Sequence, residues 1–169
     1  DQEARAAQDQ SPWSWQALAL SQTGQGQVAQ ATQSYEHLGS VEEVGPSYAA
    51  SGLGDLATYQ GRFADAVRIL EQGAADDLKD GNGDRAANKF AALAFAQLLR
   101  QQRGPAAEAA EQALAHSQAV KIRFLAGRIF AEAGVTARAR ALSTGLAAEL
   151  QAEPQAYAKI IDGVIALKS

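Results

Sequence analysis

The stretches GQVAQA (26–31), GRFADA (61–66), GPAAEA (104–109) and GVTARA (134–139) share the pattern Gly-x-x-Ala-x-Ala. Each glycine follows one helical, apolar-periodic segment and precedes another, which is where a left-handed residue ends a helix. Successive glycines are 35, 43 and 30 residues apart, scattered about the ~34 residues of a two-helix repeat. The pattern therefore predicts a series of helical hairpins, each turning at one of these glycines.

Small residues recur at two fixed distances from these glycines. Five residues after each glycine, the second helix carries an alanine: Ala31, Ala66, Ala109 and Ala139. Seven residues before each glycine, the first helix carries Ala19, Gly54, Gln97 and Gly127, among which Gln97 is the exception. Glycine inside a helix costs ~1 kcal/mol relative to alanine. Gly54 and Gly127 therefore predict places where a neighbouring helix approaches closely.

The repeats divide the chain into hairpins with short connections. We expect units at about 12–38, 47–78, 84–116 and 119–150, a half-unit at 154–169, and the end of a preceding helix at 1–10. The polar segment DDLKDGNGD (76–84) predicts a frayed helix end and a loop, which would explain the 43-residue interval. GSVEEVGPS (39–47) predicts the other linker, with Pro46 in the first turn of the following helix.

The last helix predicts a chain that belongs to a larger protein. Asp162-Gly163 matches Leu53-Gly54 and Ala126-Gly127, so the next turn glycine is expected one residue beyond Ser169. The helix that follows Pro154 would then lack its partner. We expect the remainder of the protein to cover its exposed face.

Composition excludes several classes of function. A net charge of -4 and a pI near 5.2 give no basic surface for nucleic acid. The absence of cysteine excludes disulfides and thiolate metal sites. The longest apolar stretch, 91–99, is too short to span a bilayer, and the first ten residues do not form a signal peptide. Abundant Ala and Gln favour an all-α fold, and the compartment stays open.

The repeats resemble the tetratricopeptide repeat family, and the resemblance covers nearly the whole chain. The matching residues are Trp15, Leu18, Ala19, Gly26, Ala31 and Tyr35 in the first copy, and Leu53, Gly54, Gly61, Phe63, Ala66 and Leu70 in the second. The third and fourth copies carry Ala113 and Ser143 in place of the aromatic residue. The resemblance implies a right-handed α-solenoid of stacked antiparallel helix hairpins. Another α-solenoid or an irregular bundle is the alternative.

The family binds peptides in a concave groove lined by the first helices. On this chain the resemblance maps that groove to Gln16, Leu20, Tyr48, Ser51, Asp55, Ala94, Leu98, Lys121, Phe124 and Arg128. Tyr48 and Phe124 would be the main anchors, because aromatic side chains give a large contact area with few rotors. The alternative is that both aromatics fill gaps between neighbouring helices. The Lys and Asn clamp that some members use for a terminal carboxylate is not matched.

Residues that could carry other chemistry are few. Asp80, Asn82 and Asp84 alternate as in a calcium loop, but Arg85 and Ala91 stand where that loop needs Gly and Glu. The two histidines, at 37 and 116, lie near the ends of second helices, and no catalytic motif is present. We therefore expect neither an enzyme nor a bound metal or cofactor.

These observations leave three hypotheses for function. The first is a module that docks a peptide or partner domain, as a regulatory part of a larger bacterial signalling or transcription-control protein. The second is an oligomerisation or spacer element that stacks through its open ends. The third is a non-catalytic region of a Ser/Thr kinase or other signalling enzyme. The basic residues Lys121, Arg123, Arg128, Arg138 and Arg140 are expected to mark exposed faces, or alternatively an acidic peptide partner.

Overall fold

The structure is a computed structural model that describes residues 11–41 and 44–168. Over these residues the chain is all-α, and it contains no strand. Its helices are α2 (Pro12–Gly24), α3 (Val28–Gly39), α4 (Gly45–Tyr59), α5 (Phe63–Lys79), α6 (Gly83–Leu99), α7 (Arg103–His116), α8 (Val120–Ala133), α9 (Thr136–Ala147) and α10 (Ala152–Lys168). The helix expected to end within residues 1–10 lies outside the described residues.

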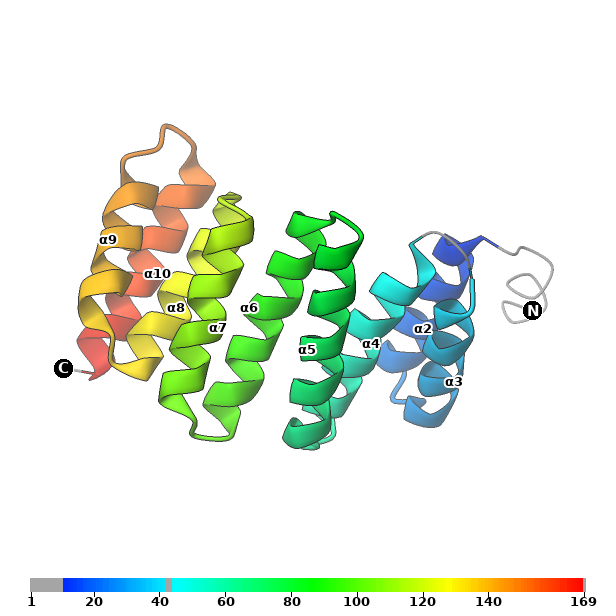
Figure 1. Cartoon of the computed structure of the whole chain (residues 1–169). Helices are drawn as coiled ribbons and strands as arrows, with labels where there is room; N and C mark the ends of the chain where they lie inside the picture. Colours follow the sequence, from blue (N-terminus) through cyan, green and yellow to red (C-terminus); the bar gives the residue numbers. More distant parts are fainter. Residues whose placement is uncertain (1–10, 42–43, 169) are drawn as a thin grey trace.

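Consecutive helices pack side by side from α2 at one end of the molecule to α10 at the other (Figure 1). They pair into the hairpins α2–α3, α4–α5, α6–α7 and α8–α9, followed by α10. Each first helix also contacts the first helix of the next hairpin, and α8 contacts α10 in the same way. Second helices do not approach one another as closely anywhere in 11–41 and 44–168. The first helices therefore form a continuous layer.

Three of the four predicted turn glycines have the expected left-handed backbone. The φ values are 73° at Gly26, 75° at Gly61 and 86° at Gly134. The prediction for the third hairpin is wrong, because Gly104 lies in the first turn of α7. The left-handed residue there is Gln101, with φ 61°. A non-glycine residue tolerates this conformation only at a cost.

Counting from Gln101 restores the regular spacing of small residues. Ala106 is five residues after it and Ala94 seven before it, and both are 0% exposed. Gln97 and Ala109 therefore do not occupy the positions predicted for them. The copy of the motif at 104–109 is displaced by three residues from the true repeat.

The segment 76–84 is not the predicted loop. Helix α5 continues to Lys79 and α6 begins at Gly83, so only residues 80–82 connect them. Gly81 supplies a further left-handed turn with φ 75°. The 43-residue interval is long because α5 and α6 each contain 17 residues and because Gly104 lies three residues beyond the turn residue Gln101. Pro46 does lie in the first turn of α4, as predicted.

Two predicted close approaches are confirmed. A Cβ on Gly54 would lie 2.7 Å from the Leu70 side chain of α5. A Cβ on Gly127 would lie 2.5 Å from Cδ1 of Ile161 on α10. Both distances are shorter than van der Waals contact, so glycine lets the neighbouring helix pack against the backbone.

The core is built mainly from alanines and aliphatic side chains on the facing sides of these helices. Such small side chains allow helix axes to approach closely. No helix within the described ranges is both long enough and apolar enough to cross a membrane.

Candidate functional site: a groove along the first helices

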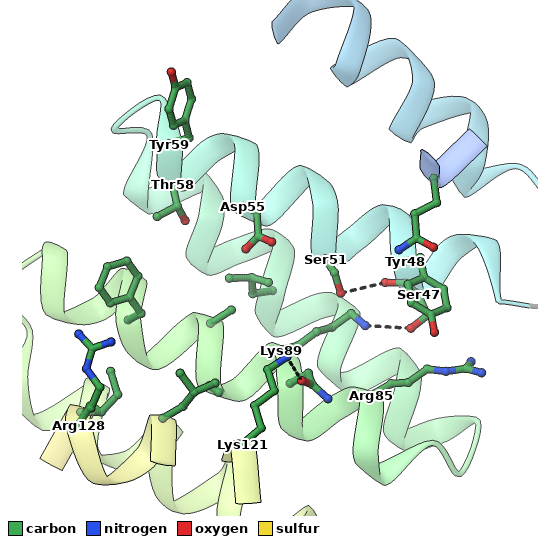
Figure 2. A pocket seen from close by; sticks show the side chains of 18 of the residues that line it. Ser47, Tyr48, Ser51, Asp55, Thr58, Tyr59, Arg85, Lys89, Lys121 and Arg128 are labelled. Atoms are coloured by element: carbon green, nitrogen blue, oxygen red, sulfur yellow. Dashed lines mark hydrogen bonds between the residues drawn. The ribbon is translucent and has the colours of Figure 1, made fainter. Parts of the chain in front are cut away.

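A cavity of about 780 Å³ lies along the layer of first helices. Its lining comes mainly from α4, α6 and α8, with Gln16 from α2 and Leu70 from α5 (Figure 2). Helix α6 contacts both α4 and α8, whereas α4 and α8 do not contact each other within the described ranges. The cavity is therefore a groove with α6 as its floor and with α4 and α8 as its walls. We refer to it as the inner groove.

The middle of the inner groove is apolar. Ala91, Ala92 and Phe95 line it from α6, and Leu125 and Ile129 line it from α8. The two alanines are too small to fill the space between the walls, which gives the groove its depth. Phe95 is 44% exposed. An exposed aromatic side chain in an apolar concavity is a favourable contact for a ligand.

The α4 wall is polar and carries one carboxylate. Ser51, Asp55, Thr58 and Tyr59 line this side. The Ser51 and Thr58 hydroxyls donate to the backbone carbonyls one helical turn earlier. Partial removal from water within the groove raises the pKa of Asp55, and the positive charge of Lys121 opposes that rise. The positive charge of Lys121 on the α8 wall therefore acts on the Asp55 carboxylate across the groove.

Cations occupy the α8 wall of the groove. Lys121 donates to the Asn88 side-chain oxygen at 3.1 Å. The Arg128 guanidinium is 3.3 Å from a Glu132 carboxylate oxygen and 5.9 Å from the centre of the Phe124 ring. The Nε of Arg128 is buried and has no hydrogen-bond partner among the described residues.

A further cation lies where the floor begins. Arg85, at the start of α6, lies 5.7 Å from the centre of the Tyr48 ring on α4. The Tyr48 ring also meets Trp13 of α2 edge-on at 5.3 Å. Tyr48 of α4 therefore contacts both neighbouring first helices, α2 and α6, at one end of the inner groove. It also lines the groove itself.

A buried ion pair lies beneath the groove at the junction of α4, α5 and α6. The Lys89 ammonium is 2.5 Å from the Asp77 carboxylate and 2.9 Å from the Ser47 hydroxyl. Both charged side chains are almost completely buried. A Cβ on Gly73 would lie 2.9 Å from Cε of Lys89, so this glycine makes room for the lysine side chain. The ion pair joins the floor helix α6 to α5, and the hydrogen bond to Ser47 joins it to the α4 wall.

The structure brings six of the ten predicted groove residues into the lining: Gln16, Tyr48, Ser51, Asp55, Lys121 and Arg128. The other four lie elsewhere. Leu20 is exposed on α2 outside the lining, Ala94 is fully buried, and Leu98 packs against the core. Phe124 stacks on Tyr157 of α10 at 4.1 Å, which matches the alternative that it fills a gap between helices.

The displaced third repeat explains the positions of Ala94 and Leu98. The residues three positions before them are Ala91 and Phe95. Both of these residues line the inner groove. The groove positions predicted on α6 are therefore three residues too late, because they were counted from Gly104 and the turn residue is Gln101.

Sequence reasoning missed Arg85, Asn88 and Lys89 on the floor. Their segment follows directly on the stretch predicted to be a loop, so it carries no expectation of a site. Lys89 lies three residues after Ala86 and four before Leu93, and this helical spacing with apolar residues is the available signal for a buried cation. Its partner Asp77 lies on the preceding helix, within the segment predicted to be frayed.

The remaining candidate residues have structural contacts. The imidazole of His37 lies 3.8 Å from the Trp15 ring, and that of His116 lies 5.8 Å from the Phe90 ring. Each pair joins the two helices of one hairpin. The candidate calcium-loop residues lie in the α5–α6 turn and the first turn of α6. The part of the chain that the structure describes contains no cluster of three side chains able to hold a metal ion.

Comparison of the sequence with models of known protein families found no match, and comparison with curated proteins found none either. The helical hairpins are thus established by the structure, whereas the family resemblance stays a prediction based on the repeat pattern.

Proposed function

We propose that this chain is a protein-binding scaffold that docks a peptide segment of its partner in the inner groove. The observation that carries the proposal is the groove itself, a concavity of about 780 Å³ formed by three successive first helices. An apolar middle bordered by polar and charged side chains is the combination expected of a recognition site. The proposal includes the tetratricopeptide-like type of the repeat and its right-handed stacking.

The distribution of exposed apolar side chains supports this assignment. Leu20, Tyr59, Phe95 and Leu99 are large, exposed side chains on the first helices α2, α4 and α6. Among the described residues of the second helices α3, α5, α7 and α9, Leu78 alone belongs to this class. Apolar surface exposed on one layer of a repeat array marks that layer as the contact face.

Selection from a random peptide library displayed on phage tests the proposal. The immobilised chain should enrich peptides with apolar anchors, and Phe95→Asp should abolish their binding, measured by fluorescence anisotropy with the synthetic peptides. Leu78→Asp on α5 is the matched control, because Leu78 is similarly exposed but lies outside the groove. Equal binding by both variants would contradict a groove-based function.

Self-association through the C-terminal end of the array is a second candidate function. Leu150 and Leu167 are 95% and 87% exposed, and Ile160 of α10 is also exposed. Apolar side chains exposed to this degree favour contact with another protein surface. Light scattering over a concentration series tests it. Self-association that Ile160→Glu with Leu167→Glu removes would support this function, and a monomer at all concentrations would exclude it.

A further inference from the structure

We infer that the inner groove selects a peptide segment that presents acidic side chains to one end of the groove and an apolar anchor farther along it. The acidic side chains would contact Arg85 and Lys121, and the anchor would rest against Phe95. This inference rests on the proposed function and adds the chemistry of the partner.

Arg85 and Lys121 have no carboxylate partner among the described residues. Lys121 donates to the neutral Asn88 amide, and Arg85 lies over the Tyr48 ring. By contrast, the guanidinium of Arg138, elsewhere on the array, donates hydrogen bonds to both carboxylate oxygens of Glu111. The positive charges of Arg85 and Lys121 are therefore available to a ligand in the groove.

The positions of these two cations are unfavourable for the helices that carry them. Arg85 lies in the first turn of α6 and Lys121 in the first turn of α8. The helix dipole favours acidic side chains there and disfavours basic ones. Neither cation forms an ion pair within 11–41 and 44–168 that would offset this cost. Their contacts, a neutral amide and an aromatic ring, leave both charges without a counter-charge, which makes the two cations candidates for function.

The charged side chains that line the groove are mostly positive, whereas the chain as a whole has a negative net charge. The lining contains Arg85, Lys89, Lys121 and Arg128 against Asp55 and Glu132. Lys89 is neutralised by Asp77 and Arg128 pairs with Glu132, so Arg85 and Lys121 face Asp55 alone among the lining residues. The chain as a whole carries a net charge of -4. An acidic segment is thus repelled by the average surface and attracted to this end of the groove.

The position of Asp55 further restricts the partner. It lies on the α4 wall, with Lys121 and Arg128 on the opposite side of the groove (Figure 2). Acidic side chains of the peptide are therefore favoured beside Arg85 and Lys121, near the first turns of α6 and α8, and disfavoured beside Asp55. The negative charge of the partner comes from acidic side chains within the segment and not from its terminal carboxylate.

The phage selection tests this inference when the peptide's carboxyl end is fused to the coat protein. Peptides enriched on the unaltered chain should contain more Asp and Glu than the starting library. Selection on Arg85→Glu with Lys121→Glu should lose that excess. The matched control is Arg103→Glu with Lys159→Glu, which reverses two exposed cations outside the groove.

Affinities of synthetic peptides give the quantitative result. Arg85→Glu with Lys121→Glu should weaken an enriched acidic peptide about tenfold or more at low salt. The difference should shrink at ~1 M salt, where the screening length is about 3 Å. C-terminally amidated and free-acid forms should bind equally. A requirement for the free carboxylate would overturn the assignment to side chains.

The outcomes separate this inference from the proposed function. If Phe95→Asp abolishes binding but charge reversal changes neither composition nor affinity, the groove binds peptides and the acidic partner is wrong. If neither change affects binding, or no peptide is enriched, both are wrong. Weakening by charge reversal in the groove, with the control pair unchanged, supports the inference.

Discussion

The second hairpin (α4–α5) and the third (α6–α7) are adjacent in the array but differ at their turns. The second turns at Gly61 and the third at Gln101. Both carry small buried residues at equal distances from the turn: Gly54 and Ala66 in the second, Ala94 and Ala106 in the third. The small packing residues are therefore the constant feature of the repeat. The turn needs only a left-handed backbone, which a non-glycine residue supplies at a cost of roughly 1–2 kcal/mol.

The two hairpins also differ at one buried position of the first helix. Twelve residues before the turn, α4 carries Ala49 and α6 carries Lys89. Lys89 needs Asp77, Ser47 and the space above Gly73, all provided by the second hairpin. The third hairpin is thus tied to the second by an ion pair, in addition to the alanine packing that both hairpins share.

The largest effect is expected when this ion pair is broken. Asp77→Leu leaves the Lys89 charge buried without its partner and should lower the free energy of unfolding by about 3–5 kcal/mol. Chemical denaturation measures the loss. Asp76→Leu, at the exposed neighbouring position, should change it by less than about 0.5 kcal/mol. Adding Lys89→Met to Asp77→Leu should restore much of the stability, and equal losses for both aspartates would refute a structural role for the pair.

The register of the third hairpin is tested by adding volume on α6. Ala94→Leu overfills a fully buried position and should cost about 1–3 kcal/mol. Gln97→Leu, at the position that glycine-based alignment would choose, should cost less than about 1 kcal/mol. Thermal unfolding of the two variants measures the difference. The reverse order of stability would show that the turn belongs at Gly104.

A smaller effect is expected when the two turn residues are exchanged. Gln101→Gly removes the left-handed strain and should stabilise the protein by about 0.5–1 kcal/mol. Gly61→Gln introduces the same strain into the second hairpin and should cost about 1–2 kcal/mol. Denaturant midpoints measure both changes. Destabilisation by both substitutions would mean that Gln101 makes a favourable contact that outweighs its backbone strain.

The smallest effect concerns the two walls of the groove. The pKa of Asp55 is raised in the folded protein, so its contribution to stability is greatest below pH 3.8 and is lost as the pH rises through the folded pKa. Because Lys121 lowers this pKa, Lys121→Gln should raise it further. Carbon-13 NMR of the carboxyl group measures the titration. Arg103→Gln, outside the groove, should leave it unchanged, and an equal response to both substitutions would contradict the proximity of Asp55 and Lys121.

Much of the architecture could be predicted from the sequence because its signals are local. Left-handed glycines at 26, 61 and 134 and the buried glycines at 54 and 127 each require a specific backbone geometry. The turn of the third hairpin could not be placed, because Gln101 gives no sequence signal of a left-handed backbone and Gly104 gives a misleading one three residues later. That displacement brought Ala94 and Leu98 into the predicted groove in place of Ala91 and Phe95.

The chemistry of the groove was less predictable, since it depends on contacts between helices distant in the sequence. Lys121 and Asn88 are 33 residues apart, and Lys89 and Ser47 are 42 apart. Such contacts decide whether a cation meets a carboxylate, as Lys89 does, or a neutral amide, as Lys121 does. Phe124 illustrates the same limit, because its partner Tyr157 lies on α10, beyond its own hairpin.

Amide hydrogen exchange of the full chain, with and without a peptide from the selection, locates the docking surface on the array. Binding in the inner groove predicts slower exchange in α4, α6 and α8 when the peptide is present. Exchange in the second helices α3, α5 and α7 should change little, because they lie outside the groove apart from Leu70. Protection confined to α10, or to the second helices, would contradict the assignment of the inner groove as the docking site.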